Sequence, residues 1–230
     1  MYLDSTYILV LIGAALSLGA SAYVNYVYKK YSKVQNSFRI SGAEMAAKVL
    51  QENGLRDVGV RPVSGMLTDH YDPASETVNL SDPVYKSRSI SAIAVAAHEC
   101  GHAIQHADGY KPLTWRTKLV PVANIGSNFG IYVVMAGLLL GLTDTLCMVG
   151  IVMFSMGVLF QLITLPVEFD ASARALQAMK ANGTLADPDE YSKARKVLTA
   201  AALTYVAGAA ASILSLLRLI LIVNRRSSRR

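Results

Sequence analysis

Charged residues, cysteines and histidines are all scarce in this chain. Of its 230 residues, 17% are charged and 53% are hydrophobic, whereas an ordinary globular domain has about 25% charged residues. This shortage of charge excludes a wholly soluble protein and indicates a membrane protein with at most one modest soluble part. The only cysteines, Cys100 and Cys147, lie in a histidine-rich motif and in an apolar stretch. They therefore suggest no disulfide framework.

The sequence also lacks internal repeats, a glycine-rich phosphate loop and any nucleic-acid-binding motif. Its formal net charge is +6, but the basic residues flank the apolar stretches. An excess of Lys and Arg is typical of the cytoplasmic flanks of membrane helices. We therefore expect a lipid bilayer, and no nucleic acid, as a partner of this chain.

Three apolar stretches are long enough to cross a bilayer, which takes about 20 residues. They are Tyr7–Val27, Leu119–Leu142 and Leu146–Leu165. A fourth, Leu198–Val223, is also long enough but contains Arg218, so three or four spans are expected. We interpret the first stretch as a retained anchor and not as a signal peptide, because lysines follow it and none precedes it.

The segments outside these stretches predict a small α+β soluble region. "SGAEMAAKVLQENG" has the capping box and the terminal glycine of a helix, "VGVRPV" alternates like a strand, and "MLTDHYDPASETVNLS" is typical of a hairpin. "SISAIAVAAHECGHAIQHADG" predicts a core helix that is too polar to be a membrane span. The predicted division is an anchor at residues 1–28, a soluble region at 29–118, a transmembrane hairpin at 119–165, a helix with a linker at 166–197, and an apolar helix with a basic tail at 198–230.

Three of the 4 histidines stand in "HECGHAIQH" on the predicted core helix. His98 and His102 are four residues apart, so both imidazoles leave one helix face and suit a single zinc ion (Zn2+). Glu99 would lie beside the ion, where it can take a proton from the zinc-bound water. His106 lies about 12 Å further along the axis than His98. We therefore interpret His106 as a packing residue or as one that supports a ligand.

The third zinc ligand has to come from elsewhere in the chain. In "VEFDASARALQA", Glu168 shares a face with regularly spaced alanines, which is what close approach to another helix requires. Asp170 faces elsewhere, and it could pair with Arg174 or orient a zinc-bound histidine. Two histidines, one glutamate and an open position for water are typical of a catalytic zinc site. The candidate oxyanion donors are His70, Tyr205 and Arg174.

Six segments resemble, in order, a known family: "SGAEMAAKVLQENGL", "GMLTDHYDP", "VNLSDPVY", "VAAHECGHAIQ", "LPVEFDASARAL" and "AALTYVAGAAAS". Together they are similar to the YugP-like neutral zinc metallopeptidases of bacterial membranes, and more distantly to the membrane heat-shock proteases and the CaaX prenyl-protein endoproteases. The resemblance implies His98, His102 and Glu168 as ligands and Glu99 as base. One departure is Ser172, where the relatives typically carry Asp, so the role of Asp170 does not follow by analogy.

These observations predict a mainly α membrane protein with a small α+β zincin-like soluble domain, whose zinc helix carries H-E-x-x-H. The expected function is a membrane-anchored zinc metallopeptidase that cleaves a peptide or membrane-protein substrate. Two alternatives stay open, namely a non-catalytic membrane adaptor with a structural zinc and an intramembrane site-2-type protease. The strand "TVNLS" is expected to be the sheet edge that pairs with an extended substrate. The oligomeric state does not follow from the sequence.

The basic flanks predict a multi-pass protein of the bacterial plasma membrane with a cytoplasmic catalytic region. Lysines and arginines follow the first apolar stretch and precede the second and the fourth. The arginines of the tail, which are Arg225, Arg226, Arg229 and Arg230, contradict this pattern if the fourth stretch crosses once. A bend near "SLLR" would return the tail to the cytoplasmic side, and the sequence alone leaves both courses open.

Overall fold

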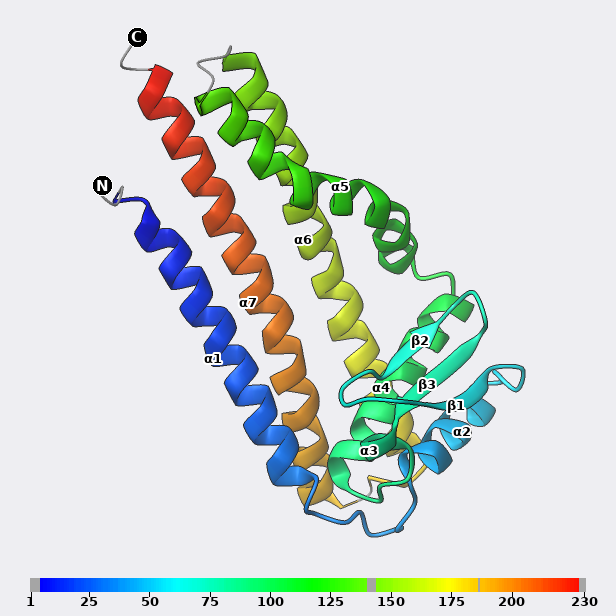
Figure 1. Ribbon diagram of the computed structural model, residues 1–230. Coiled ribbons are helices and arrows are strands. Elements are labelled where there is room, and N and C mark those ends of the chain that lie inside the picture. The colour runs from blue at the N-terminus through cyan, green and yellow to red at the C-terminus, as the bar shows by residue number, and fades with distance from the viewer. Residues whose placement is uncertain (1–4, 140–143, 186, 228–230) are drawn as a thin grey trace. The chain divides into compact units, whose positions relative to one another are not determined.

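Four helices are long and apolar enough to cross a bilayer, as the sequence predicts. They are α1 (Tyr7–Tyr31), α5 (Lys111–Leu139), α6 (Asp144–Ala181) and α7 (Pro188–Ser227) (Figure 1). The computed structural model describes residues 5–139, 144–185 and 187–227. The predicted turn between the second and third spans falls mostly on residues 140–143, and thus lies outside this part of the chain.

The chain divides into two compact units. The helical unit comprises Met1–Ser21, Thr114–Pro166 and Thr204–Arg230, and the mixed unit comprises Ala22–Leu113 and Val167–Leu203. Each of the four long helices contributes residues to both units. The five-part division expected from the sequence stays a prediction.

Small residues allow close packing inside the helical unit. A Cβ added at Gly130 of α5 would lie 2.9 Å from the carbonyl oxygen of Gly150 and 2.7 Å from the backbone nitrogen of Phe154, both on α6. Gly13 of α1 and Ala211 of α7 approach in a similar way. Because lipid tails are as apolar as the helices, such close backbone contact is a main source of helix association in a membrane.

One expectation about the long helices is wrong, and the structure answers one question that the sequence left open. The ligand segment does not start a new helix after the third apolar stretch, because α6 continues through Pro166. α7 continues past "SLLR" to Ser227, so the helix does not break to return the tail. A proline costs a helix one hydrogen bond, and apolar helices accept it where nearby groups satisfy the carbonyl that it leaves.

The mixed unit contains a three-stranded sheet and three shorter helices (Figure 1). The elements are α2 (Gly42–Glu52), β1 (Gly59–Val63), β2 (His70–Asp72), β3 (Thr77–Ser81), α3 (Asp82–Tyr85) and α4 (Ile90–Ala107). The capping box predicted at the start of α2 is present: Ser41 accepts a hydrogen bond from the Glu44 backbone, and Glu44 accepts one from the Ser41 backbone. The predicted small α+β content is therefore confirmed.

The sheet order corrects the expected substrate edge. The order is β1-β3-β2, with β1 parallel and β2 antiparallel to β3. The "TVNLS" strand is β3, which has a neighbour on each side and thus offers no edge for an extended peptide. Both edge strands, β1 and β2, lie next to β3, and the sequence placed β2 in the same hairpin as β3. Strand order depends on contacts between distant segments, which local alternation does not encode.

A close contact between α4 and α6 fixes the geometry of the mixed unit. A Cβ added at Gly101 would lie 2.4 Å from the carbonyl oxygen of Ala171, so only glycine fits between the two backbones. Ala97 comes one turn before Gly101 on α4 and Ala175 comes one turn after Ala171 on α6, and both are buried. Their small side chains let the two helices approach closely, which brings together the polar groups that the next subsection describes.

Candidate metal centre

The helix α4 carries His98, Glu99 and His102 on its buried half. It begins after Ser89, whose hydroxyl accepts a hydrogen bond from the backbone of Ala92, and it runs without interruption to Ala107. Glu99 is 8% exposed and His102 is 9% exposed. The imidazoles of His98 and His102 lie edge to face, with ring centroids 4.8 Å apart. Both rings therefore leave the same helix face, as their spacing predicts.

Glu168 of α6 meets these two imidazoles. Its Oε2 lies 3.3 Å from Nε2 of His98 and 3.7 Å from Nε2 of His102. All three ligand atoms fall within 4.8 Å of one another, and Glu168 is only 2% exposed. The structure thus brings together the three residues that the sequence and the resemblance nominate as ligands, from two helices of one unit.

The donor set fits a zinc ion. Two ligands about 2.1 Å from a tetrahedral zinc lie about 3.4 Å apart, which matches the two distances between the imidazoles and the carboxylate. Two imidazole nitrogens and one carboxylate oxygen are ligands that zinc accepts at catalytic sites. Among the residues that the structure describes, no further His, Cys, Asp or Glu joins this group.

The charges of the three residues are tightly linked. Burial alone would raise the pKa of Glu168, but hydrogen bonds and positive charge from His102 and His98 hold the pKa of this carboxyl well below its usual range. Burial alone would lower the pKa of His102, but the carboxylates of Glu168 and Glu99 raise it above its usual value. In the metal-free protein, an ionised carboxylate therefore favours a protonated imidazole beside it.

Gln105 fixes the far side of the His102 ring. Its Oε1 lies 3.0 Å from Nδ1 of His102. Its Nε2 donates 2.8 Å hydrogen bonds to the carbonyl oxygen of Val167 and to Oδ2 of Asp170. An amide oxygen can only accept, so Nδ1 of His102 carries a proton in both the neutral and the protonated ring. Nε2 is thus the nitrogen that a metal would bind once Nε2 has lost its own proton. Gln105 is fully buried and links α4 to α6.

Ser172 contacts the His98 ring in the way that Gln105 contacts the His102 ring. Its hydroxyl lies 3.2 Å from Nδ1 of His98. The hydroxyl oxygen of Ser172 can accept a hydrogen bond from Nδ1–H of His98. With Nδ1 protonated in this way, Nε2 of His98 is the nitrogen that can bind a metal.

A hydrogen bond from strand β2 orients the carboxylate of Glu99. Its Oε2 accepts a 3.1 Å hydrogen bond from the backbone N–H of Tyr71 on β2. The hydroxyl of Tyr71 in turn lies 2.9 Å from Nδ1 of His106. His106 is exposed and outside the ligand group, so it contacts the strand that orients Glu99 and does not contact the ligands.

Asp170, Arg174 and His70 are not members of the ligand group. Asp170 accepts hydrogen bonds from Gln105 and from Arg174, so it reaches His102 only through the amide. Arg174 also pairs with Asp108 and stacks on Tyr110. His70 is exposed, with Nδ1 2.8 Å from the carbonyl oxygen of Thr68. Tyr205 belongs to the helical unit, and an oxyanion role for any of these residues stays a prediction.

Sequence reasoning missed Gln105, Ser172 and Tyr71. Gln105 stands three residues after His102 and Ser172 stands four residues after Glu168, so helical spacing alone could have nominated both. Tyr71 acts through its backbone N–H, and no side-chain pattern reveals such a contact.

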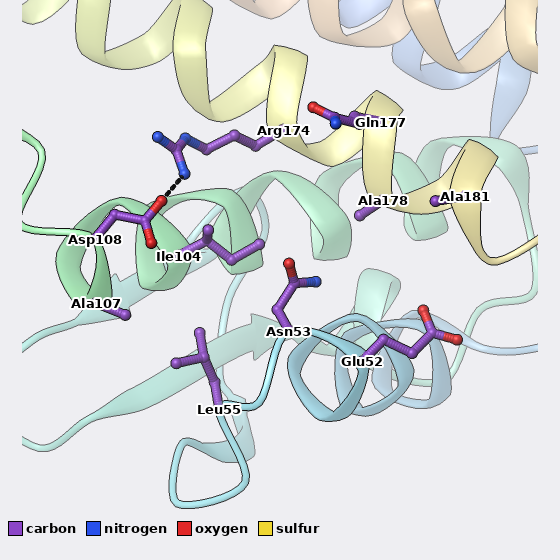
Figure 2. A pocket seen from close by; sticks show the side chains of 10 residues that line it. All are labelled: Glu52, Asn53, Leu55, Ile104, Ala107, Asp108, Arg174, Gln177, Ala178 and Ala181. Atoms are coloured by element: carbon purple, nitrogen blue, oxygen red, sulfur yellow. Dashed lines mark hydrogen bonds and ion pairs between the residues drawn. The ribbon is translucent and has the colours of Figure 1, made fainter.

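A pocket of about 370 Å³ lies beside this hydrogen-bonded chain, between α2, α4 and α6 (Figure 2). Its wall includes Asn53, Ile104 and the ion pair between Asp108 and Arg174. None of the three candidate ligands lines it. The pocket is therefore separate from the three candidate ligands. Arg174 lines the pocket and donates a hydrogen bond to Asp170, which in turn contacts Gln105.

Comparisons with known proteins agree with this chemistry. A family model described as "Putative neutral zinc metallopeptidase" matches residues 6–224. A protein of Bacillus subtilis (strain 168), described as "Putative membrane protease YugP", is 50% identical over 207 residues, which cover 90% of this chain and 91% of that protein. No solved structure matches the chain.

Replacing Gln105 by Leu should weaken zinc binding about 10- to 100-fold, because the change removes the acceptor that orients His102. The measurement is a competition titration of the purified protein with a zinc-binding dye. Gln177→Leu is the matched control, because Gln177 is an exposed residue of α6 outside the hydrogen-bonded chain. Equal zinc affinity of the two variants would show that the amide does not position the ligand.

The stability of the metal-free protein should fall as the pH rises from 6 to 8. The raised pKa of His102 stabilises the fold below its unfolded value of about 6.5, and this contribution is lost as the pH rises through the folded value. The lowered pKa of Glu168 means that its ionised carboxylate stabilises the fold at neutral pH. This stabilisation is lost only at acidic pH, as the pH falls through the folded pKa. Zinc affinity should rise over the same range, because zinc displaces the proton.

The thermal unfolding midpoint of chelator-treated protein measures this dependence, and about 1 kcal/mol corresponds to about 2–4 °C for a chain of this length. The variant His102→Gln provides the control, since it should lose the trend between pH 6 and 8. A wild-type midpoint that stays constant over this range would contradict the linkage between the two groups.

Proposed function

Because this chain belongs to the family described as "Putative neutral zinc metallopeptidase", we propose that it is a membrane-anchored zinc endopeptidase whose metal ligands are His98, His102 and Glu168. One observation carries the proposal: two imidazoles and a buried carboxylate converge from separate helices, and Glu99 stands next to them on α4. The four apolar helices and the membrane protease similar to this chain support its placement in a membrane.

In the proposed reaction, Glu99 is the general base. It takes a proton from the attacking water and donates this proton to the leaving nitrogen. The oxygen of the water joins the carbonyl carbon as the C–N bond breaks, and its second proton also passes to the nitrogen, so the products are a carboxylate and an ammonium group. The hydrogen bond from the Tyr71 backbone holds one of its carboxylate oxygens and thereby orients the group. Zinc bound at the site would supply Lewis acidity, which polarises the scissile carbonyl and the water.

The remaining protein groups keep the ligands in their reactive form. Gln105 and Ser172 each meet the Nδ1 of one imidazole, which leaves both Nε2 atoms available as ligands. Glu168 stays ionised because its pKa is held well below the usual range by the neighbouring imidazoles. These three interactions preorganise the site before substrate arrives.

The alternatives have less support. A structural zinc would call for a closed fourth ligand, and the described residues supply three. A site-2-type protease would carry the motif on a membrane-spanning helix, whereas His98 and His102 lie on α4, which is not among the four long apolar helices. A peptide or membrane-protein substrate is therefore proposed for a site outside the bilayer core.

Paired substitutions of the two glutamates test the function. Glu99→Gln should keep zinc binding and lose about 10²- to 10⁴-fold in activity, because only the proton transfer is removed. Glu168→Ala should lose zinc, because one of three ligands is gone. The measurements are bound zinc by elemental analysis and cleavage of casein by the purified protein. Glu52→Gln, at an exposed residue of α2, is the control, and full activity in Glu99→Gln would refute the proposed base.

The proposed orientation places the mixed unit in the cytoplasm of a bacterial cell. Lysines end α1 and others precede the apolar parts of α5 and α7, which favours this side. A cysteine introduced at Ser37 should thus resist a membrane-impermeant maleimide in intact spheroplasts and react after lysis. Labelling of that cysteine in intact spheroplasts would reverse the orientation, and the cysteine-free protein gives the background.

A further inference from the structure

The amide group of Gln105 has one orientation that its surroundings accept. A glutamine amide consists of an acceptor oxygen and an NH₂ group with two donors. Nε2 of Gln105 faces two acceptors on α6, the carbonyl oxygen of Val167 and Oδ2 of Asp170, each at 2.8 Å. A flipped amide would place its oxygen against both of these oxygens, which is costly for a fully buried group. The two acceptors therefore determine that Oε1 faces His102.

Arg174 holds the carboxylate of Asp170 in place. Nε of Arg174 donates a 2.6 Å hydrogen bond to Oδ2 of Asp170, which lies one helical turn earlier on α6. The same Oδ2 atom accepts the hydrogen bond from Gln105. Two donors thus converge on one oxygen, and this oxygen is the acceptor that helps to orient the amide.

The arginine is also held on its outer side. Its Nη1 pairs with Asp108, which follows the last residue of α4, at the wall of the pocket (Figure 2). Its guanidinium carbon lies 5.7 Å from the centre of the Tyr110 ring. A continuous series of hydrogen bonds therefore joins, from the pocket to the metal centre, Asp108, Arg174, Asp170, Gln105 and His102.

We propose that Asp170 and Arg174 are positioning residues of the metal centre, which act on His102 through the buried amide. This role rests on the proposed function, because His102 is one of its zinc ligands. An amide oxygen held toward Nδ1 favours the ring form that carries its proton on Nδ1 and leaves Nε2 to bind the metal. Both residues act at a distance from the ion, and neither is a ligand.

The zinc affinity of the purified full-length protein, measured by competition with a zinc-binding dye, tests this role. Asp170→Leu should weaken zinc binding about 10-fold, because the amide loses one of the two acceptors that orient it. Asp170→Asn should rescue the affinity to within about threefold, since the two converging donors select the oxygen of the new side chain. Asp189→Leu is the matched control, because Asp189 also pairs with a basic residue four positions later in the same unit.

A double-mutant cycle separates positioning through the amide from a general effect on the fold. In the Gln105→Leu protein, Asp170→Leu should cause no further loss of zinc affinity, because the group through which it acts is gone. Losses that multiply in the double variant would overturn the proposal, and so would an unchanged affinity in Asp170→Leu alone. If Asp170→Leu does not fold, Arg174→Met replaces it in both backgrounds and should give the same pattern.

The same titrations distinguish this role from the proposed metal site. Zinc binding that does not need Glu168 would refute the metal site and the positioning role together. Zinc binding that needs Glu168 but is equally tight in Asp170→Leu and Asp189→Leu would refute the positioning role alone.

Discussion

The contact of one buried carboxylate with two imidazoles holds together the helices on which the proposed chemistry depends. Glu168 is almost completely shielded from water, and a carboxylate in such a place is costly unless donors or positive charge surround it. His98 and His102 provide both. Because the two histidines lie on α4 and Glu168 lies on α6, the electrostatic requirement of one side chain determines how two distant segments pack.

The packing around these residues keeps Glu168 close to the two imidazoles. Gly101 lets the backbone of α6 approach α4 so closely that a single methyl group would overlap a carbonyl oxygen. Gln105 bridges the same two helices through one acceptor and two donor bonds. Apolar contact alone would allow the helices to slide, whereas a buried amide with three partners is satisfied only in one register. The small residues set the distance and the polar residues set the alignment.

The sequence was informative wherever a feature is local. The spacing of His98 and His102, the capping box of α2 and the length of the apolar stretches each follow from a few neighbouring residues. Glu168 was within reach because the alanines on its face predict close helix packing. The central position of β3 and the contact of the Tyr71 backbone with Glu99 could not be predicted, since both depend on partners far away in the chain. The expectation that a separate helix starts at residue 166 was wrong for another reason: the preference of Pro166 for the first turn of a helix was overridden by the surrounding structure.

The position of Glu168 on a long helix has a consequence for the ligand group. α6 runs without interruption from Asp144 to Ala181, and Glu168 lies on the part of it that belongs to the mixed unit. A helix rises about 1.5 Å and turns about 100° for each residue. A slip of one residue would therefore swing the carboxylate away from the imidazoles. The alignment of α6 against α4 is therefore as much a condition for the ligand group as the identity of the three side chains.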